Sequence, residues 1–258
     1  MPEISAPPKV AATKGYGATV IFSGSTSVER EAMADKVIAD TGARLVPPYD
    51  HADIILGQGT LGLELQEQVE AIMAGEATDR ITGETPGMVK KARGGKQRKG
   101  LDAVIAPCGG GGMLSGVALS CEGTGIAVFG AEPEFEGADD CKRGFEAGRR
   151  IESVSTLTIA DGLRTPVGRV PWGIIYERRL VKDMYSATED EIKAALRLVY
   201  ERFKLVVEPS AVVPLAVALY NEDFRKMVEE QAGPEGWDLG IVFSGGNVSL
   251  ENLGKLFS

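Results

Sequence analysis

An unbroken run of glycines stands between two apolar segments of the sequence. The run consists of Gly109, Gly110, Gly111 and Gly112. The segment before it, residues 101–106, is short, mostly apolar and contains β-branched residues, which predicts a buried strand. The segment after it, residues 113–120, predicts the first turns of a helix. Glycine loses more backbone entropy on folding than any other residue, so four in a row indicate positions that only glycine can fill.

A strand, a glycine loop and a helix N-terminus in this order can bind an anion. Free N–H groups of the loop and first helical turn point at one place, where the helix dipole also favours negative charge. Glycines let the backbone approach a phosphate closely, and the apolar flanks favour this interpretation over a flexible linker. The run is neither a dinucleotide-binding GxGxxG motif, because Leu114 occupies its third glycine position, nor a Walker loop, because no Gly-Lys-Ser/Thr follows.

Strand-like and helix-like segments alternate along the chain. This pattern predicts an α/β fold with three layers, a mainly parallel twisted sheet with helices on both faces. Binding sites in such sheets lie at the carboxyl ends of the strands, where both glycine loops, 109–112 and 244–246, fall. The predicted strands are 17–24, 43–48, 101–106, 125–133 and the start of 239–253, and the predicted helices are 28–42, 54–74, 113–120, 190–204, 210–220 and the end of 239–253.

Residues 75–100 break the alternation. They are polar and glycine-rich, and six basic residues stand between positions 90 and 99. We expect a mobile basic insertion on the surface. A basic run can also contact nucleic acid, but a solvated loop is the more common outcome.

Composition limits the functions that the chain can have. The formal net charge is −9, which argues against nucleic-acid and anionic-membrane partners. No apolar run is long enough for a membrane helix, and residues 1–18 lack the apolar core of a signal peptide. Cys108, Cys121 and Cys141 show no metal-binding spacing. We therefore expect a cytoplasmic protein.

His51 is the only histidine of the sequence. A hydrolase built on it is an alternative, but no GxSxG motif accompanies it. Its surroundings, "PPYDHAD", predict a surface loop.

Six motifs of the sequence resemble, in their order, those of the fold-type II pyridoxal-phosphate enzymes. The resemblance is strongest to the serine racemase and serine/threonine dehydratase branch, in a family that also includes tryptophan synthase β-like enzymes. It implies a pyridoxal-phosphate-dependent lyase or racemase that acts on small hydroxy amino acids and forms a homo-oligomer. The motifs are "GQGTLGLEL" (57–65), "DAVIAPCGGGGMLSGVAL" (102–119), "GAEP" (130–133), "ADGLRTPVG" (160–168), "EPSAVVPLAVAL" (208–219) and "SGGNVSL" (244–250).

The resemblance assigns roles around the cofactor. Gly109–Gly112 and Met113 would hold its phosphate through backbone N–H groups, and Ser244 would be the hydroxyl partner of its pyridine nitrogen. Glu208 would lie near the ring and Gly162 at its edge. A neutral hydroxyl leaves the ring nitrogen unprotonated, which suits β-elimination and racemisation.

The racemase branch also implies a divalent cation. Its ligands would be Glu132, the carbonyl of Ala138 and Asp140, and such oxygen ligands suit Mg²⁺ or Ca²⁺. The connecting segment is two residues longer here than is usual, so an acidic surface loop is the alternative.

Two family motifs are missing from this sequence. The Schiff-base lysine motif, "FKxRGA"-like, and the substrate loop, "SSGNHG"-like, have no counterpart, and Lys9 and Lys14 match a segment that follows both. The catalytic residues are therefore unknown, and we expect no covalent link to the cofactor. The pattern is typical of a fold-type II chain incomplete at its N-terminus, with residues 1–49 as a remnant of the small domain and 50–258 as the large cofactor-binding domain.

Three hypotheses follow for function. The chain is part of an amino-acid dehydratase or racemase, a pseudoenzyme that binds a phosphate ligand or a partner, or a cofactor-independent enzyme on the shortened scaffold. We expect a small amino acid or a phosphate compound as the ligand.

Overall fold

The computed structural model describes residues 1–5, 7–24, 27–74 and 100–257. The chain divides into two compact units, one made of Met1–Pro47 with Gly246–Ser258 and the other of Pro48–Gly245. The basic insertion predicted at 75–100 lies, except for Gly100, outside the described residues. The domain division predicted at residue 49 stays a prediction.

The smaller unit contains helices and extended chain. Its helices are α1 (Pro7–Gly15), α2 (Ser27–Thr41) and α11 (Leu250–Phe257). Neither strand predicted here is formed. Residues 17–24 make a single parallel bridge, Pro2 with Ser23, and residues 43–48 contain two prolines that cannot donate to a ladder. A segment becomes a strand only when a partner strand pairs with it, and for the described residues of these two segments the pairing is limited to this bridge.

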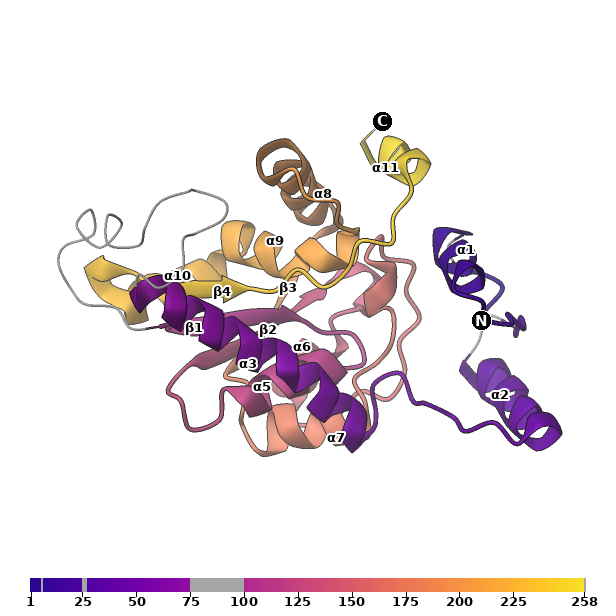
Figure 1. The fold of residues 1–258 in the computed structure, drawn as a ribbon. Helices are drawn as coiled ribbons and strands as arrows, with labels where there is room; N and C mark the ends of the chain where they lie inside the picture. The colour runs from indigo at the N-terminus through magenta and orange to yellow at the C-terminus, as the bar shows by residue number, and fades with distance from the viewer. Residues whose placement is uncertain (6, 25–26, 75–99, 258) are drawn as a thin grey trace. The chain divides into compact units, whose positions relative to one another are not determined.

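A parallel sheet of four strands forms the centre of the larger unit (Figure 1). The strand order is β3-β2-β1-β4, with β1 paired to both β2 and β4. The register aligns Val104 with Val128 and Gly240. Strands predicted at 101–106, 125–133 and the start of 239–253 are confirmed, whereas β3 was not predicted. The strands are β1 (Ala103–Pro107), β2 (Ala127–Pro133), β3 (Asp183–Ala187) and β4 (Leu239–Ile241).

Helices cover both faces of this sheet, as predicted. α5 (Gly112–Ser120) packs between the sheet and α3 (Ala52–Ala74), and α9 (Val213–Tyr220) packs between the other face and α8 (Glu189–Leu198) (Figure 1). The other helices of the described residues are α6 (Asp140–Ala147), α7 (Arg169–Trp172) and α10 (Glu222–Ala232), together with 3-10 and π turns at Phe135–Gly137, Asp161–Leu163, Gly173–Glu177, Val199–Phe203, Pro209–Val212 and Gly233–Glu235.

The ends of α8 follow from the sequence. Thr188 accepts a hydrogen bond from the N–H of Glu191, and the Glu191 carboxylate accepts one from the N–H of Thr188, which forms a capping box. The helix predicted at 190–204 therefore begins where expected. It continues through the turn Val199–Phe203 and ends at Lys204, which has a φ of 59°.

The backbones of α3 and α5 lie in direct contact. A Cβ placed on Gly116 would lie 2.5 Å from the N atom of Gly59 and 2.5 Å from the carbonyl oxygen of Ile55. A Cβ built on Gly59 would in turn lie 3.0 Å from the carbonyl oxygen of Gly116. The motif "GQGTLGLEL" thus serves helix packing here, because its second glycine lets α3 approach the helix that follows the tetraglycine loop.

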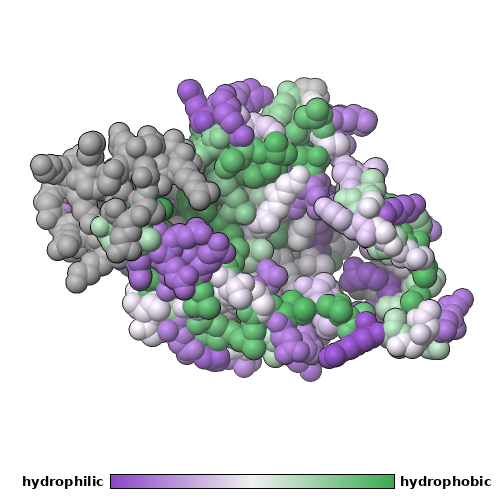
Figure 2. All heavy atoms as spheres, viewed as in Figure 1, coloured by the Kyte–Doolittle hydropathy of each residue, from purple (hydrophilic) through white to green (hydrophobic). Residues whose placement is uncertain are grey.

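Apolar side chains also reach the surface of the molecule (Figure 2). In the smaller unit, Tyr16 is 92% exposed and Val46 is 71% exposed. Within the described part of the chain, no helix combines the length and the apolar character that crossing a membrane requires.

Candidate functional site

The tetraglycine loop connects β1 to the N-terminus of α5, as the sequence predicts. Gly111 is the N-cap of α5 and has a φ of 84°, in the left-handed region that glycine adopts without strain. The Gly111 carbonyl accepts a hydrogen bond from the N–H of Ser115, and the Gly110 carbonyl accepts one from the N–H of Gly168. These bonds fix the loop at the carboxyl end of β1.

Protein atoms crowd the place that a side chain would take at each of the four glycines. A Cβ on Gly109 would lie 3.0 Å from the Cα of Leu163, and one on Gly111 would lie 2.8 Å from the Cβ of Pro171. The ring of Tyr49 lies where a Cβ on Gly110 would point. The Cα of Tyr49 lies 3.1 Å from a Cβ built on Gly112. Packing on the side where a Cβ would point therefore favours glycine at all four positions.

The backbone donors of the loop remain available to a ligand. In the part of the chain that the structure describes, no hydrogen bond is donated by the N–H of Gly109, Gly110, Gly111 or Gly112, although all four residues are buried. N–H groups of a first helical turn have no acceptor within their own helix. Such donors at the positive end of α5 fit the oxygens of a phosphate.

Three more segments meet beside this loop. A Cβ on Gly109 would lie 3.2 Å from the carbonyl oxygen of Gly162, and the N–H of Gly162 donates to Ser210 Oγ at 2.9 Å. Glu208 Oε1 lies 3.6 Å from a Cβ built on Gly162 and 2.9 Å from one built on Gly245. Residues far apart in the sequence thus form one surface around the phosphate loop.

The structure places the other predicted contacts as follows. The N–H of Glu208 donates to the carbonyl of Gly245 at 2.9 Å, which holds the segment that carries Ser244 beside Glu208. Ser244 is exposed and Met113, in the first turn of α5, is half-buried. Their roles toward the cofactor, like those of Gly162 and Glu208, stay predictions.

Sequence reasoning missed Tyr49, Asp50 and Ser210. Asp50 accepts hydrogen bonds from the N–H groups of Arg169 and Val170, at 3.0 and 2.8 Å, and so ties the start of α7 to the segment before α3. Ser210 stands inside the quoted "EPSA" motif, where its hydroxyl was a visible signal. Tyr49 and Asp50 lie beside His51, in a segment that the sequence marks only as a loop.

His51 is a surface residue, as predicted. Its side chain is 44% exposed, and its Nδ1 accepts a hydrogen bond from the N–H of Asp53 at 3.2 Å. This bond supplies an acceptor for a backbone N–H in the first turn of α3.

Glu132 and Asp140 are buried, so the acidic surface-loop alternative is wrong for both. Glu132 is 0% exposed and Asp140 is 1% exposed. Glu132 accepts from the N–H groups of Cys141 and Lys142, at 3.1 and 2.9 Å, and Asp140 accepts from the N–H of Val167 at 2.9 Å. Ala138 is buried near them. The turn Phe135–Gly137 lies between the two carboxylates in sequence, and its residues Phe135 and Glu136 are exposed.

Burial raises the pKa of both carboxyl groups. For Glu132 the neighbouring charge of Asp140 raises the pKa further, although two backbone N–H groups lower it. The pKa of Asp140 is raised to about 6, because burial outweighs the hydrogen bond from Val167. A cation between such carboxylates would offset their repulsion, and the assignment of Glu132, Ala138 and Asp140 as its ligands stays a prediction.

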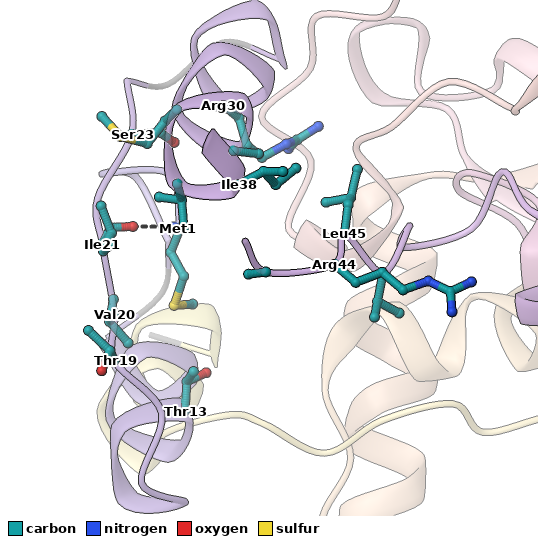
Figure 3. A pocket seen from close by; sticks show the side chains of 15 residues that line it. Met1, Thr13, Thr19, Val20, Ile21, Ser23, Arg30, Ile38, Arg44 and Leu45 are labelled. Atoms are coloured by element: carbon teal, nitrogen blue, oxygen red, sulfur yellow. Dashed lines mark hydrogen bonds between the residues drawn. The ribbon is translucent and has the colours of Figure 1, made fainter. Parts of the chain in front are cut away.

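The smaller unit has a pocket of its own, shown in Figure 3. Its volume is about 440 Å³, and apolar side chains such as Val20, Ile38 and Leu45 line most of it. Arg30 and Arg44 are the charged side chains of the lining. The pocket contains none of the predicted site residues.

Comparison with known proteins identifies the family of this chain. A family model described as pyridoxal-phosphate dependent enzyme matches residues 1–245. The chain belongs to this family. The resemblance inferred from the six motifs is thereby confirmed, and so is the fold class.

Relatives in the pyridoxal-phosphate dependent enzyme family include racemases and lyases. The chain is 38% identical over 244 residues to serine racemase of Arabidopsis thaliana, covering 94% of this chain and 62% of that protein. It is 35% identical over 261 residues to L-threo-3-hydroxyaspartate ammonia-lyase of Saccharomyces cerevisiae, covering 100% of this chain and 67% of that protein. The solved structure of maize serine racemase superposes with a TM-score of 0.79 at 35% identity, covering 99% of this chain and 67% of that one.

The residues present fit the phosphate of the family's cofactor. The buried loop offers unused N–H donors at a helix N-terminus, and the surface that Gly162, Glu208 and Gly245 form lies beside it. Lys9 and Lys14, which do not match the family's Schiff-base lysine motif, belong to α1 of the smaller unit.

Proposed function

We propose that this chain forms the cofactor-binding part of a pyridoxal-phosphate dependent racemase or ammonia-lyase that acts on small hydroxy amino acids. The observation that carries the proposal is the tetraglycine loop, with buried and unused N–H donors at the start of α5. The relatives support the substrate class, because serine and 3-hydroxyaspartate both carry a hydroxyl on the β-carbon.

Each part of the site has a task in this proposal. The N–H groups of Gly109–Gly112 and Met113 bind the phosphate, and the hydroxyl of Ser244 donates a hydrogen bond to the unprotonated pyridine nitrogen. Glu208, held by Gly245, borders the ring, and Gly162 leaves room at its edge. When bound, pyridoxal phosphate stabilises negative charge at the α-carbon of an amino acid.

A neutral hydroxyl at Ser244 suits this reaction class. It does not add a formal charge beside the ring nitrogen, whereas a carboxylate there would favour a protonated ring. The groups that move the α-proton are not among the residues assigned here, so binding and turnover are separate questions for this chain.

The proposal is tested by titrating the chain with pyridoxal phosphate, with pyridoxal and with inorganic phosphate. We expect pyridoxal phosphate to bind at least roughly tenfold more tightly than pyridoxal, because charge-assisted hydrogen bonds to phosphate contribute about 1.5–3 kcal/mol each. Inorganic phosphate should compete. Equal affinity for pyridoxal and pyridoxal phosphate would overturn the assignment of the loop.

A second arm tests Ser244. Ser244→Ala should weaken pyridoxal phosphate binding by roughly 2- to 10-fold, the value of one hydrogen bond of about 0.5–1.5 kcal/mol. Ser155→Ala is the matched control, since Ser155 is also exposed and is not part of the site. Borohydride treatment should leave no stable adduct on a lysine, and such an adduct would contradict non-covalent binding.

A further inference from the structure

Two thiols and a carboxyl group meet at the carboxyl ends of β1 and β2. Cys108 directly follows β1 and donates its N–H to the carbonyl of Ala131 at 2.9 Å, which continues the ladder toward Glu132. Cys141, in the first turn of α6, donates its N–H to Glu132 Oε1 at 3.1 Å. The two Sγ atoms and a Glu132 oxygen all lie within 4.8 Å of one another.

All three side chains are fully buried, each with an exposed fraction of 0%. Val167 and Trp172 belong to the same apolar core cluster as the two cysteines. A buried carboxylate is costly unless another charge or a set of hydrogen bonds compensates it. The two backbone N–H groups on Glu132 supply part of this compensation, and a cation would supply the rest.

The pKa of each thiol is raised, which favours its neutral form. A hydrogen bond with Cys141, burial and the nearby Glu132 raise the pKa of Cys108 well above its ordinary value. A hydrogen bond with Cys108 lowers the pKa of Cys141, but burial and the neighbouring carboxyl groups raise it more. Low reactivity toward oxidants follows, because the thiolate is the reactive form.

The chemistry of these donors differs from that of the set Glu132, Ala138 and Asp140. Thiolates select thiophilic ions such as Zn²⁺, whereas Mg²⁺ and Ca²⁺ prefer sets of oxygens. Zinc–ligand distances of about 2.0–2.3 Å place tetrahedral ligand atoms roughly 3.3–3.8 Å apart. The observed spread, within 4.8 Å, therefore needs only small side-chain movements to close on an ion.

We propose that Cys108, Cys141 and Glu132 form a binding site for a thiophilic divalent cation, with Zn²⁺ as the natural candidate. On binding, the ion replaces the protons of two thiols and one carboxyl group, which pass to solvent. The site shares Glu132 with the oxygen set, so an ion in one position competes with an ion in the other.

Such an ion would connect the phosphate loop to α6. Cys108 precedes Gly109 directly, and Cys141 lies in the first turn of the helix whose N–H groups hold Glu132. The inference does not depend on the proposed function, because it concerns metal binding in the absence of any cofactor or substrate. Since the ligands are buried, we expect loading to accompany folding.

The test is refolding of the full chain with Zn²⁺ or Co²⁺ alone, followed by removal of free metal. We expect one zinc ion per chain by elemental analysis, a higher melting temperature, and a near-ultraviolet thiolate-to-cobalt charge-transfer band. Cys108→Ser and Cys141→Ser should each lower zinc affinity by more than about 100-fold, the upper end of the loss caused by removing a supporting group. Circular dichroism establishes that each variant is folded, and Cys108→Ala and Cys141→Ala replace any serine variant that is not.

Cys121→Ser is the matched control. Cys121 is also a free, buried cysteine of the larger unit, but it lies outside the cluster, and its variant should keep the ion and the cobalt band. Equal metal content in all variants would overturn the proposal. So would a Cys108–Cys141 disulfide by mass spectrometry in a chain without metal, or binding of Mg²⁺ with exclusion of Zn²⁺.

Discussion

The ring of Tyr49 lies where a side chain on Gly110 would point. We expect Gly110→Ala to lower the free energy of unfolding by about 1–3 kcal/mol, the usual cost of overpacking. Tyr49→Ala in the same chain should recover part of this loss. Urea unfolding of the two single variants and the double variant gives the coupling energy.

The same three variants separate packing from ligand binding. If the loop binds phosphate through N–H groups alone, the double variant should keep its affinity for pyridoxal phosphate while Gly110→Ala loses it through the displaced loop. Additive losses in the three unfolding curves would contradict the role of Tyr49.

At the same scale, Asp140 makes stability depend on pH. Its pKa is raised to about 6 by burial, whereas an unfolded chain titrates near the ordinary value of 3.8. The folded state therefore binds the proton more tightly, so stability is greatest below about pH 4 for this group and is lost as the pH rises through about 6. Glu132 acts in the same direction.

The variant Asp140→Asn tests this dependence in buffer with chelator. An amide oxygen can still accept from the N–H of Val167, so the fold is retained while the titration is removed. We expect the loss of stability between pH 4 and 7 to shrink, by about 1.4 kcal/mol for each pH unit by which burial raises the pKa of Asp140. An unchanged slope would assign the pH dependence to other groups.

At the scale of elements, the crossing of α3 and α5 depends on bare backbone. Gly116→Ala would bring its Cβ to 2.5 Å from the N atom of Gly59, and two helix backbones cannot yield as a flexible side chain can. We expect a loss of several kcal/mol in unfolding free energy, at or above the roughly 1–3 kcal/mol of ordinary overpacking.

Gly57→Ala is the control for this crossing. Gly57 lies in the same helix, and a Cβ there would meet no atom within 4 Å. Alanine should stabilise α3 by up to about 1 kcal/mol, the difference in helix propensity. Thermal melts compare the two, and a Gly116→Ala chain as stable as Gly57→Ala would contradict the close contact.

The sequence predicted those elements whose pattern is local. The buried strand before the glycine loop and the helix with its capping box at Thr188 are defined by neighbouring residues, and both are present. Residues 17–24 and 43–48 have strand-like composition, but a strand also needs a partner, which a local pattern cannot supply. The strand Asp183–Ala187 shows the reverse, because pairing with β2 forms it from a polar-looking segment.

Likewise, the residues of the candidate site were predicted where a sequence motif contains them and were missed where only the tertiary fold brings them together. The tetraglycine loop, Gly162 and Glu208 belong to motifs that the family resemblance identifies. Tyr49 and Cys141 lie outside these motifs. Cys108 stands in one of them, but its proximity to Cys141 arises from the tertiary fold. Spacing along the chain gave no metal pattern for these cysteines, since their distance in sequence says nothing about neighbouring ends of β1 and α6.

At the scale of the whole molecule, the two units differ in how much they bury. Among the described residues of the smaller unit, only Ser23 and Leu253 are buried, and α1 buries none. In the larger unit, β1 is buried along its whole length. Local stability follows the density of buried contacts, so we expect the smaller unit to open first.

Amide hydrogen exchange of the dilute chain tests this order. Residues 1–47 should exchange orders of magnitude faster than β1 and β2, whose strands form the centre of the sheet. Equal protection in both units of a monomer would contradict the expectation.

Exposed apolar side chains of the smaller unit further predict self-association. Tyr16 and Val46 are 92% and 71% exposed, and covering such surface in a second copy would remove it from water. We expect light scattering to show oligomers that grow with concentration, together with slower exchange in residues 1–47. Val46→Ser should weaken this association, whereas Leu157→Ser, which removes a side chain 68% exposed in the larger unit, should leave it unchanged. A monomer at every concentration would show that the smaller unit is stable with its apolar side chains in water.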